Sequence, residues 1–199
     1  MFNELKVIQA SRDLLDAIYG EWWREDSNFK GTPGRMMRSY REILGSEDPN
    51  SRTNQISKCF KSTFPSEHNS IIFAPNIKTH SMCPHHMLPV SYTMTIAYLP
   101  KKKGTVLGAS KLERVARILS ARAVLQEDLT VQIARTINEY LVPEGVAVVT
   151  SGVHDCMRCR GIKSQGTFEL SHMIGAFKDN PETRSEFFSL MQLAEMRRK

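Results

Sequence analysis

The chain has 199 residues, of which 41% are hydrophobic and 24% are charged, and this composition fits one globular domain with a sizeable core. No apolar run approaches the roughly 18 residues that a membrane span needs, and charged residues interrupt the apolar positions of the N-terminus, unlike those of a signal peptide. We therefore expect a soluble, cytoplasmic protein without a membrane partner. The net charge of +6 permits an anionic ligand, but no recognised nucleic-acid motif accompanies it, so we expect no nucleic-acid partner.

The first third of the chain indicates helices followed by a polar segment. Apolar residues recur at helical spacing over residues 4–24, and a turn follows at residues 26–28. Thr32 and Pro33 predict a second helix, with Thr32 as N-cap, that runs to about residue 44. Residues 46–66 are rich in Ser, Asn and Pro and predict a loop. We expect residues 1–66 to form an N-terminal helical region and loop.

The rest of the chain alternates paired strands with paired helices. Short strands are expected at residues 71–73 and 77–81, and period-two alternation predicts another from Tyr92 to Tyr98. Two amphipathic helices follow, and Ser110 is expected to cap the first. After them we expect strands at residues 146–153 and about 157–177, and then a helix from residue 181. This order predicts an α+β fold with an antiparallel sheet over residues 67–199. The basic runs at 101–103 and 197–199 are expected to be solvated surface.

Two clusters along the chain combine cysteine with histidine. In a chain without an export signal, such cysteines favour a metal or catalytic role over a disulfide. The first cluster has Cys83 three residues before His86, with His85 between them. The second spans residues 154–161, and if it is extended, His154, Cys156, Arg158 and Arg160 share one face.

Thiolates and an imidazole together suit Zn²⁺, and three protein ligands leave a fourth position for water, whose pKa zinc lowers to about 7. A spare histidine, His85 or His154, would then transfer protons. A closed structural zinc site that includes Cys159 is the alternative, although Cys159 differs from Cys156 in face parity. Cys59 and His68 are expected to be packing residues.

Several ordered motifs lie around and between these clusters. The patterns C-E-H-H-L-L-P and H-x-C-M-x-x-R-G are matched at residues 83–89 and 154–161. Between them, G-L-S-K-L-x-R-I and Q-E-R-L-T are matched at residues 108–115 and 126–130. Further matches are T-P-x-R at residues 32–35 and C-terminal patterns at 175–177 and 184–187. In this order the motifs resemble those of the GTP cyclohydrolase I family over about residues 30–190.

The resemblance implies a fold, a zinc-dependent hydrolase reaction and an assembly. The family has the tunnelling fold, an antiparallel sheet with two helices on one face, here preceded by N-terminal helices. A zinc-activated water attacks C8 of GTP, a histidine protonates N7, formate leaves, and a dihydropterin triphosphate forms for pterin or folate biosynthesis. Subunits assemble into ring-shaped homo-oligomers, commonly decamers, with active sites at their interfaces.

The resemblance also assigns roles to residues that match the family motifs. Cys83, His86 and Cys156 would bind Zn²⁺, and His85 and His154 would transfer protons. The implied substrate-binding residues are Gln126 and Glu127 at the guanine edge, and Ser110, Lys111, Arg114, Arg160 and Arg35 at the triphosphate and ribose end. Pro84 and Asp128 depart from the family's Glu and Arg, which leaves open a related purine nucleotide as substrate, or a non-catalytic zinc protein.

Overall fold

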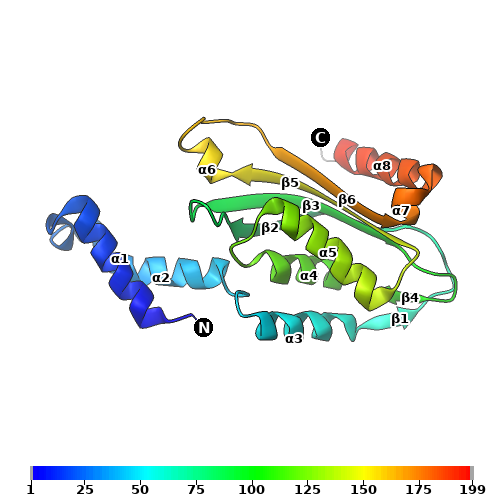
Figure 1. Ribbon diagram of the computed structural model, residues 1–199, viewed down its shortest axis with the longest axis horizontal. Helices are drawn as coiled ribbons and strands as arrows, with labels where there is room; N and C mark the ends of the chain where they lie inside the picture. The colour runs from blue at the N-terminus through cyan, green and yellow to red at the C-terminus, as the bar shows by residue number, and fades with distance from the viewer. Residues whose placement is uncertain (1, 198–199) are drawn as a thin grey trace.

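The computed structural model describes residues 2–197, and its centre is an antiparallel four-stranded sheet (Figure 1). The strand order is β2-β3-β5-β6, and β1 pairs with β4 in a separate two-stranded sheet. The strands are β1 Thr63–Pro65, β2 Ile72–Met82, β3 Pro89–Leu99, β4 Thr105–Leu107, β5 Gly145–His154 and β6 Phe168–Gly175. The helices are α1 Glu4–Tyr19, α2 Thr32–Ile43, α3 Pro49–Phe60, α4 Ser110–Ser120, α5 Gln126–Leu141, α6 Asp155–Arg158, α7 Ala176–Asp179 and α8 Pro181–Met196.

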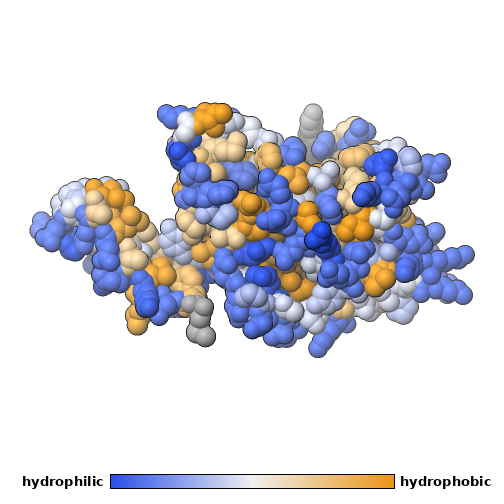
Figure 2. Space-filling view, viewed as in Figure 1, coloured by the Kyte–Doolittle hydropathy of each residue, from blue (hydrophilic) through white to orange (hydrophobic). Residues whose placement is uncertain are grey.

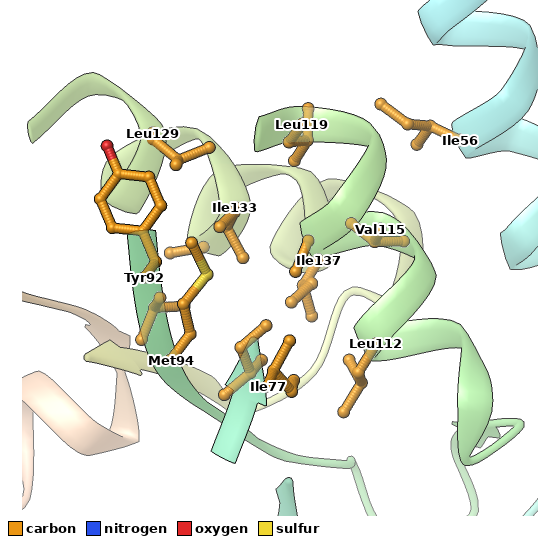
Figure 3. Close-up of a cluster of buried hydrophobic side chains, with 14 of the residues drawn as sticks. Ile56, Ile77, Tyr92, Met94, Leu112, Val115, Leu119, Leu129, Ile133 and Ile137 are labelled. Carbon is orange, nitrogen blue, oxygen red and sulfur yellow. The ribbon is translucent and has the colours of Figure 1, made fainter. Parts of the chain in front are cut away.

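The main core lies between one face of the sheet and the helices α4 and α5 (Figure 3). The period-two pattern of β3 places Tyr92, Met94, Ile96 and Tyr98 on this face, each 3% exposed or less. The apolar stripes of the two helices meet these side chains: Leu112, Val115, Ala116 and Leu119 of α4, and Leu129, Ile133 and Ile137 of α5. The expected α+β architecture, with two helices packed on one face of an antiparallel sheet, is confirmed.

The opposite face of the sheet carries a smaller core under α7 and α8 (Figure 1). Ala97 and Ala147 project to this face because they alternate with the residues of the main core. Phe177 and Phe187 pack against them, and both are fully buried. The predicted C-terminal helix from residue 181 is thereby confirmed and is fixed to the sheet.

The helices α1 and α2 form an arm that extends away from the sheet (Figure 1). Glu4 and Arg41 form an ion pair between the two helices at 2.5 Å. Short 3-10 turns at Trp22–Arg24 and Ser27–Phe29 connect them. Hydrophobic side chains remain at the surface of this arm, with Leu5 and Ile18 80% and 60% exposed (Figure 2). No helix among residues 2–197 combines the length and apolar character that crossing a bilayer requires.

Several expected element boundaries are wrong. Residues 49–60 form α3 and not a loop, because Asp48 caps the helix through two backbone N–H groups and Pro49 fits its first turn. Residues 72–82 are one strand with an irregularity after Ala74, and not two short strands. Thr32 and Ser110 are the first residues of their helices and not N-caps; Gly31 and Ala109 precede them without a side-chain cap bond.

The last predicted strand is shorter than expected. Residues 155–158 form a single helical turn, and the strand begins only at Phe168. The shared face expected for His154, Cys156, Arg158 and Arg160 therefore does not form. The basic run at 101–103 is exposed, as expected, whereas Arg198 and Lys199 lie outside the described residues.

Candidate metal centre

The register of the sheet brings the two cysteine clusters to the same end of the molecule. Val90 of β3 pairs with Ser81 of β2 on one side and with His154 of β5 on the other. The turn that joins β2 to β3 and the helical turn after β5 therefore emerge side by side. The first turn is closed by backbone bonds in both directions: Cys83 N–H donates to Leu88 O, and Met87 N–H donates to Cys83 O, each at 2.9 Å.

Cys83, His86 and Cys156 converge from these two turns. Their ligand atoms all lie within 4.8 Å of one another. The two Sγ atoms are 3.8 Å apart, and Cys83 Sγ is 3.9 Å from His86 Nδ1. For tetrahedral zinc with bond lengths of about 2.3 Å to sulfur and 2.0 Å to nitrogen, ligand atoms are separated by about 3.5–3.8 Å. The donor set and its spacing therefore fit a tetrahedral metal site with one vertex left open.

A closed four-ligand site is not formed by the residues that the structure describes. Cys159 is exposed, and its Sγ donates to Asp155 O at 2.8 Å. The convergent group found among residues 2–197 contains only the three ligands from the two turns. Burial is the main cause that raises the pKa of Cys156, and the neighbouring Cys83 thiol adds to it. Cys59 packs in the core, as expected, whereas His68 is exposed and is not a packing residue.

A cavity of about 360 Å³ opens beside the three ligands. Four further predicted site residues line it, namely His85, His154, Gln126 and Glu127. Its remaining wall is largely apolar and is made by Pro84, Val90, Val124, Leu125, Met157 and Phe168. A largely apolar ligand that presents polar groups to these side chains therefore suits this cavity.

His154 is the last residue of β5, and its ring contacts three neighbouring side chains. Its Nε2 is 2.8 Å from Gln126 Oε1, and its ring meets Tyr92 and Phe168 edge-on at 6.4 and 6.1 Å between centroids. Burial lowers the pKa of His154, while the charge of Glu127 acts in the opposite direction. Burial raises the pKa of Tyr92 to about 12, although a hydrogen bond from Ser81 opposes this rise. The lowered pKa favours the neutral form of the His154 ring.

Glu127 lies in the first turn of α5, where the helix dipole favours a carboxylate. Its side chain is exposed to the cavity, whereas the neighbouring Gln126 is only 1% exposed. Glu127 is therefore available to a ligand. Gln126 has its polar atoms engaged by the protein.

None of the predicted cationic residues lines this cavity, and most of them lie in other parts of the described chain. Lys111 and Arg114 line a separate groove of about 410 Å³ between α3 and α4, together with Lys58. Arg35 lies on α2, where it donates to Asn28 O at 3.3 Å, and exposed Ser110 begins α4.

Two arginines follow the second cysteine cluster. Arg160 is exposed in the loop after α6, and its charge acts to lower the pKa of Cys156, against the stronger effect of burial. Arg158 forms an ion pair with Asp155 at 2.8 Å. The structure thus brings together the metal, histidine and guanine-edge candidates, but not the proposed triphosphate set.

Sequence reasoning missed three residues that shape these sites. Phe168 forms a wall of the cavity, and Lys58 is a further cation in the groove that Lys111, Arg114 and Arg117 also line. Gly152 lies beside Gln126, where a Cβ atom would stand 2.2 Å from Gln126 Oε1. A glycine inside a strand is a signal of close approach, so Gly152 was detectable from the sequence.

Comparison with known proteins places the chain in a family. The family model described as GTP cyclohydrolase I matches residues 7–192. The GTP cyclohydrolase 1 of Pelotomaculum thermopropionicum is 40% identical over 195 residues, which cover 96% of this chain and 98% of that protein. That of Corynebacterium glutamicum (strain R) is 38% identical over 197 residues, which cover 96% of this chain and 94% of that protein.

Among solved structures, the archaeosine synthase QueF-Like in its apo form matches 54% of this chain and 96% of its own, with a TM-score of 0.45 and 19% identity. The match to the family model spans nearly the whole chain, and the identities to curated relatives extend over almost their full length. The chain therefore belongs to the GTP cyclohydrolase I family.

Proposed function

We propose that the chain hydrolytically opens the imidazole ring of the guanine of GTP, releasing formate and giving 7,8-dihydroneopterin triphosphate. The observation that carries this proposal is the convergence of Cys83, His86 and Cys156 beside a cavity with two further histidines and an accessible carboxylate. Family membership supports the same activity, a hydrolase reaction that supplies pterin and folate biosynthesis.

Zn²⁺ is the metal that the two thiolates and one imidazole favour, and when bound there it supplies a Lewis acid that activates water at neutral pH. Glu127 is proposed to bind the guanine edge, because one carboxylate accepts hydrogen bonds from both N1–H and the 2-amino group. The apolar wall that includes Val124 and Phe168 would enclose the purine. His85 and His154 would supply the proton that N7 takes up and transfer protons as the ring opens.

The triphosphate is proposed to be bound by Ser110, Lys111, Arg114 and Arg160, with Arg35 joining from the N-terminal arm. These cations do not line the cavity that contains the metal ligands of the same chain. A ring-shaped homo-oligomer, as expected from the family, would resolve this separation by placing a neighbouring subunit's α4 against the cavity. The open edges of β2 and β6 and the apolar surface of the N-terminal arm support such an assembly.

We further propose that residues 67–199 are the catalytic domain and residues 1–66 the N-terminal helical region. The metal ligands, both spare histidines and Glu127 all lie in the former segment. The arm of α1 and α2 lies in the latter and extends away from the sheet (Figure 1).

The proposal is tested by incubating the zinc-loaded full chain with GTP and measuring formate together with the fluorescent pterin that oxidation produces. The Cys156→Ser variant is expected to lose bound zinc and turnover. Cys159→Ser is the matched control, because Cys159 is exposed and outside the ligand group, and it should retain both. Zinc-loaded wild-type protein that yields neither product would refute the proposed activity.

Pro84 supports a second candidate, a related purine nucleotide as substrate. It lines the cavity directly beside the metal ligands, where the family pattern has a carboxylate. Comparing kcat/KM for GTP, dGTP, ITP and ATP discriminates between the candidates. GTP as clearly the best substrate would eliminate this second candidate.

A further inference from the structure

The side-chain amide of Gln126 is fixed in one orientation by its surroundings. Its Nε2 is 2.8 Å from Phe168 O, 3.1 Å from Thr150 O and 3.0 Å from Thr150 Oγ1. Backbone carbonyl oxygens only accept hydrogen bonds, so the amide NH₂ must face them and Oε1 must face the other way. With Gln126 only 1% exposed, reversing the amide would place Oε1 against two carbonyl oxygens without water to separate them.

The hydroxyl groups of Thr130 and Thr150 are compatible with this orientation of the Gln126 amide. Thr130 Oγ1 donates to Gln126 O at 2.7 Å, which uses its only proton. Thr150 Oγ1 then donates to Thr130 Oγ1 at 2.8 Å and keeps a lone pair for the Nε2 group of Gln126. Every proton in this buried chain has an acceptor, so the orientation of the Gln126 amide is the one that satisfies all of its members.

Gln126 Oε1 therefore accepts its hydrogen bond from His154, and His154 Nε2 must carry a proton. We propose that Gln126 is a positioning residue that holds His154 as its Nε2–H tautomer and leaves the ring's lone pair on Nδ1. This inference rests on the proposed function only for the role of His154 in proton transfer. It replaces the direct guanine contact expected for Gln126, because both polar atoms of that amide are already bonded.

Gly152 is the residue that makes space for this bond. A Cβ atom at this position would stand 2.2 Å from Gln126 Oε1 and 3.1 Å from His154 Nε2. Any other residue would therefore clash with Gln126 Oε1 and crowd His154 Nε2 from the side. The Gln126 amide is thus bonded through Nε2 to β5 and β6, and through Oε1 to His154.

The experiment is solid-state NMR of the zinc-loaded full chain with ¹⁵N,¹³C-labelled histidine at mildly alkaline pH, with His154 assigned by comparison with a His154→Gln sample. Ring ¹⁵N–¹³C correlations identify which nitrogen carries the proton. The wild-type chain is expected to show protonated Nε2 and bare Nδ1 at His154. Protonated Nδ1 at this position in the wild-type chain would overturn the proposal.

The Gln126→Met variant removes the acceptor at nearly constant side-chain length. We expect a second, Nδ1–H form of His154 to appear, kcat with GTP to fall by about 100-fold, and KM to change by less than about threefold. Thr150→Val is the matched control, because it removes a buried hydroxyl of the same network but keeps Thr150 O, Phe168 O and Oε1 in place. It should show the single tautomer and a kcat within about threefold of wild type.

Two results with Gln126→Met would contradict the assignment. A raised KM with unchanged kcat would identify Gln126 as a guanine ligand, and an unchanged tautomer with unchanged kcat would make it a packing residue. Because the NMR measurement needs no turnover, failure of this proposal is distinguishable from failure of the proposed GTP reaction.

Discussion

Replacing Gly152 by alanine is a small change that disturbs the candidate site without replacing a functional side chain. Gly152 lies within β5, and no positive φ is recorded there, so alanine suits its backbone conformation. The added Cβ would lie 2.2 Å from Gln126 Oε1, whereas an ordinary contact is 3.4 Å or longer. One of the two must therefore move by 3.4 − 2.2 = 1.2 Å.

The expected loss in the free energy of unfolding depends on which atoms can move. The Gln126 amide is bonded to Thr150 and Phe168, so a shift of this size breaks its 2.8 Å bond with His154 or loosens the bonds behind it. Overpacking of a core costs about 1–3 kcal/mol, and one lost hydrogen bond costs about 1 kcal/mol. Alanine recovers about 0.4–1 kcal/mol through the unfolded chain. We expect a net loss near 2 kcal/mol, which lowers the Tm by about 4–8 °C for a chain of this size.

The assay is a thermal melt of zinc-loaded Gly152→Ala, run beside GTP turnover. Gly34→Ala is the control, because its Cβ would meet only the end of the Arg38 side chain, at 3.6 Å, and alanine is the better helix former. This control should melt at or above the wild-type temperature with normal turnover. If Gly152→Ala instead melts with the wild type and keeps its kcat, the steric reasoning about the Gln126–His154 pair is wrong.

Three other perturbations have expected outcomes. Cys156→Ser should lower the zinc content measured by elemental analysis to near zero while Cys159→Ser retains it, and equal zinc contents would refute the ligand assignment. Glu127→Gln should raise KM for GTP by at least about tenfold, because an amide cannot accept from both guanine donors, and a KM equal to wild type would exclude that contact. Burial, followed by two nearby cations, lowers the pKa of His172 below 6.5, so His172 destabilises the fold as pH falls through about 6.5 and the unfolded chain takes up a proton. His172→Gln should therefore lose less Tm than wild type between about pH 7.5 and pH 5, and equal losses would contradict this assignment.

The parts of the fold that sequence predicted are those whose burial repeats with the period of the element. In β3, Tyr92 to Tyr98 alternate between core and opposite face, and the apolar stripe of α4 recurs every three or four residues. The convergence of Cys83, His86 and Cys156 was also predictable, because cysteine close to histidine in the sequence favours a shared metal site. Each of these signals is local and does not depend on the rest of the chain.

The parts that were missed depend on contacts that the sequence does not display. In α3 the segment is polar, and it is helical because Asp48 caps it and Ile56 and Phe60 pack near α4. The helical turn at Cys156 replaces a predicted strand because β5 ends at His154. The hydrogen bonds that fix the Gln126 amide could not be predicted, because its acceptors on β5 and β6 lie 24 and 42 residues away along the chain.

The register of three strands is the physical link between this fold and its candidate chemistry. Ser81, Val90 and His154 form one row across β2, β3 and β5, so the ligand-bearing turns begin at the same level. A slip of one residue in β3 would turn its core side chains to the opposite face. Burial of Met94 and Ile96 against α5 prevents this slip, although both lie well away from the metal ligands. Core packing therefore sets the 3.8 Å spacing between two sulfur atoms that are 73 residues apart in the chain.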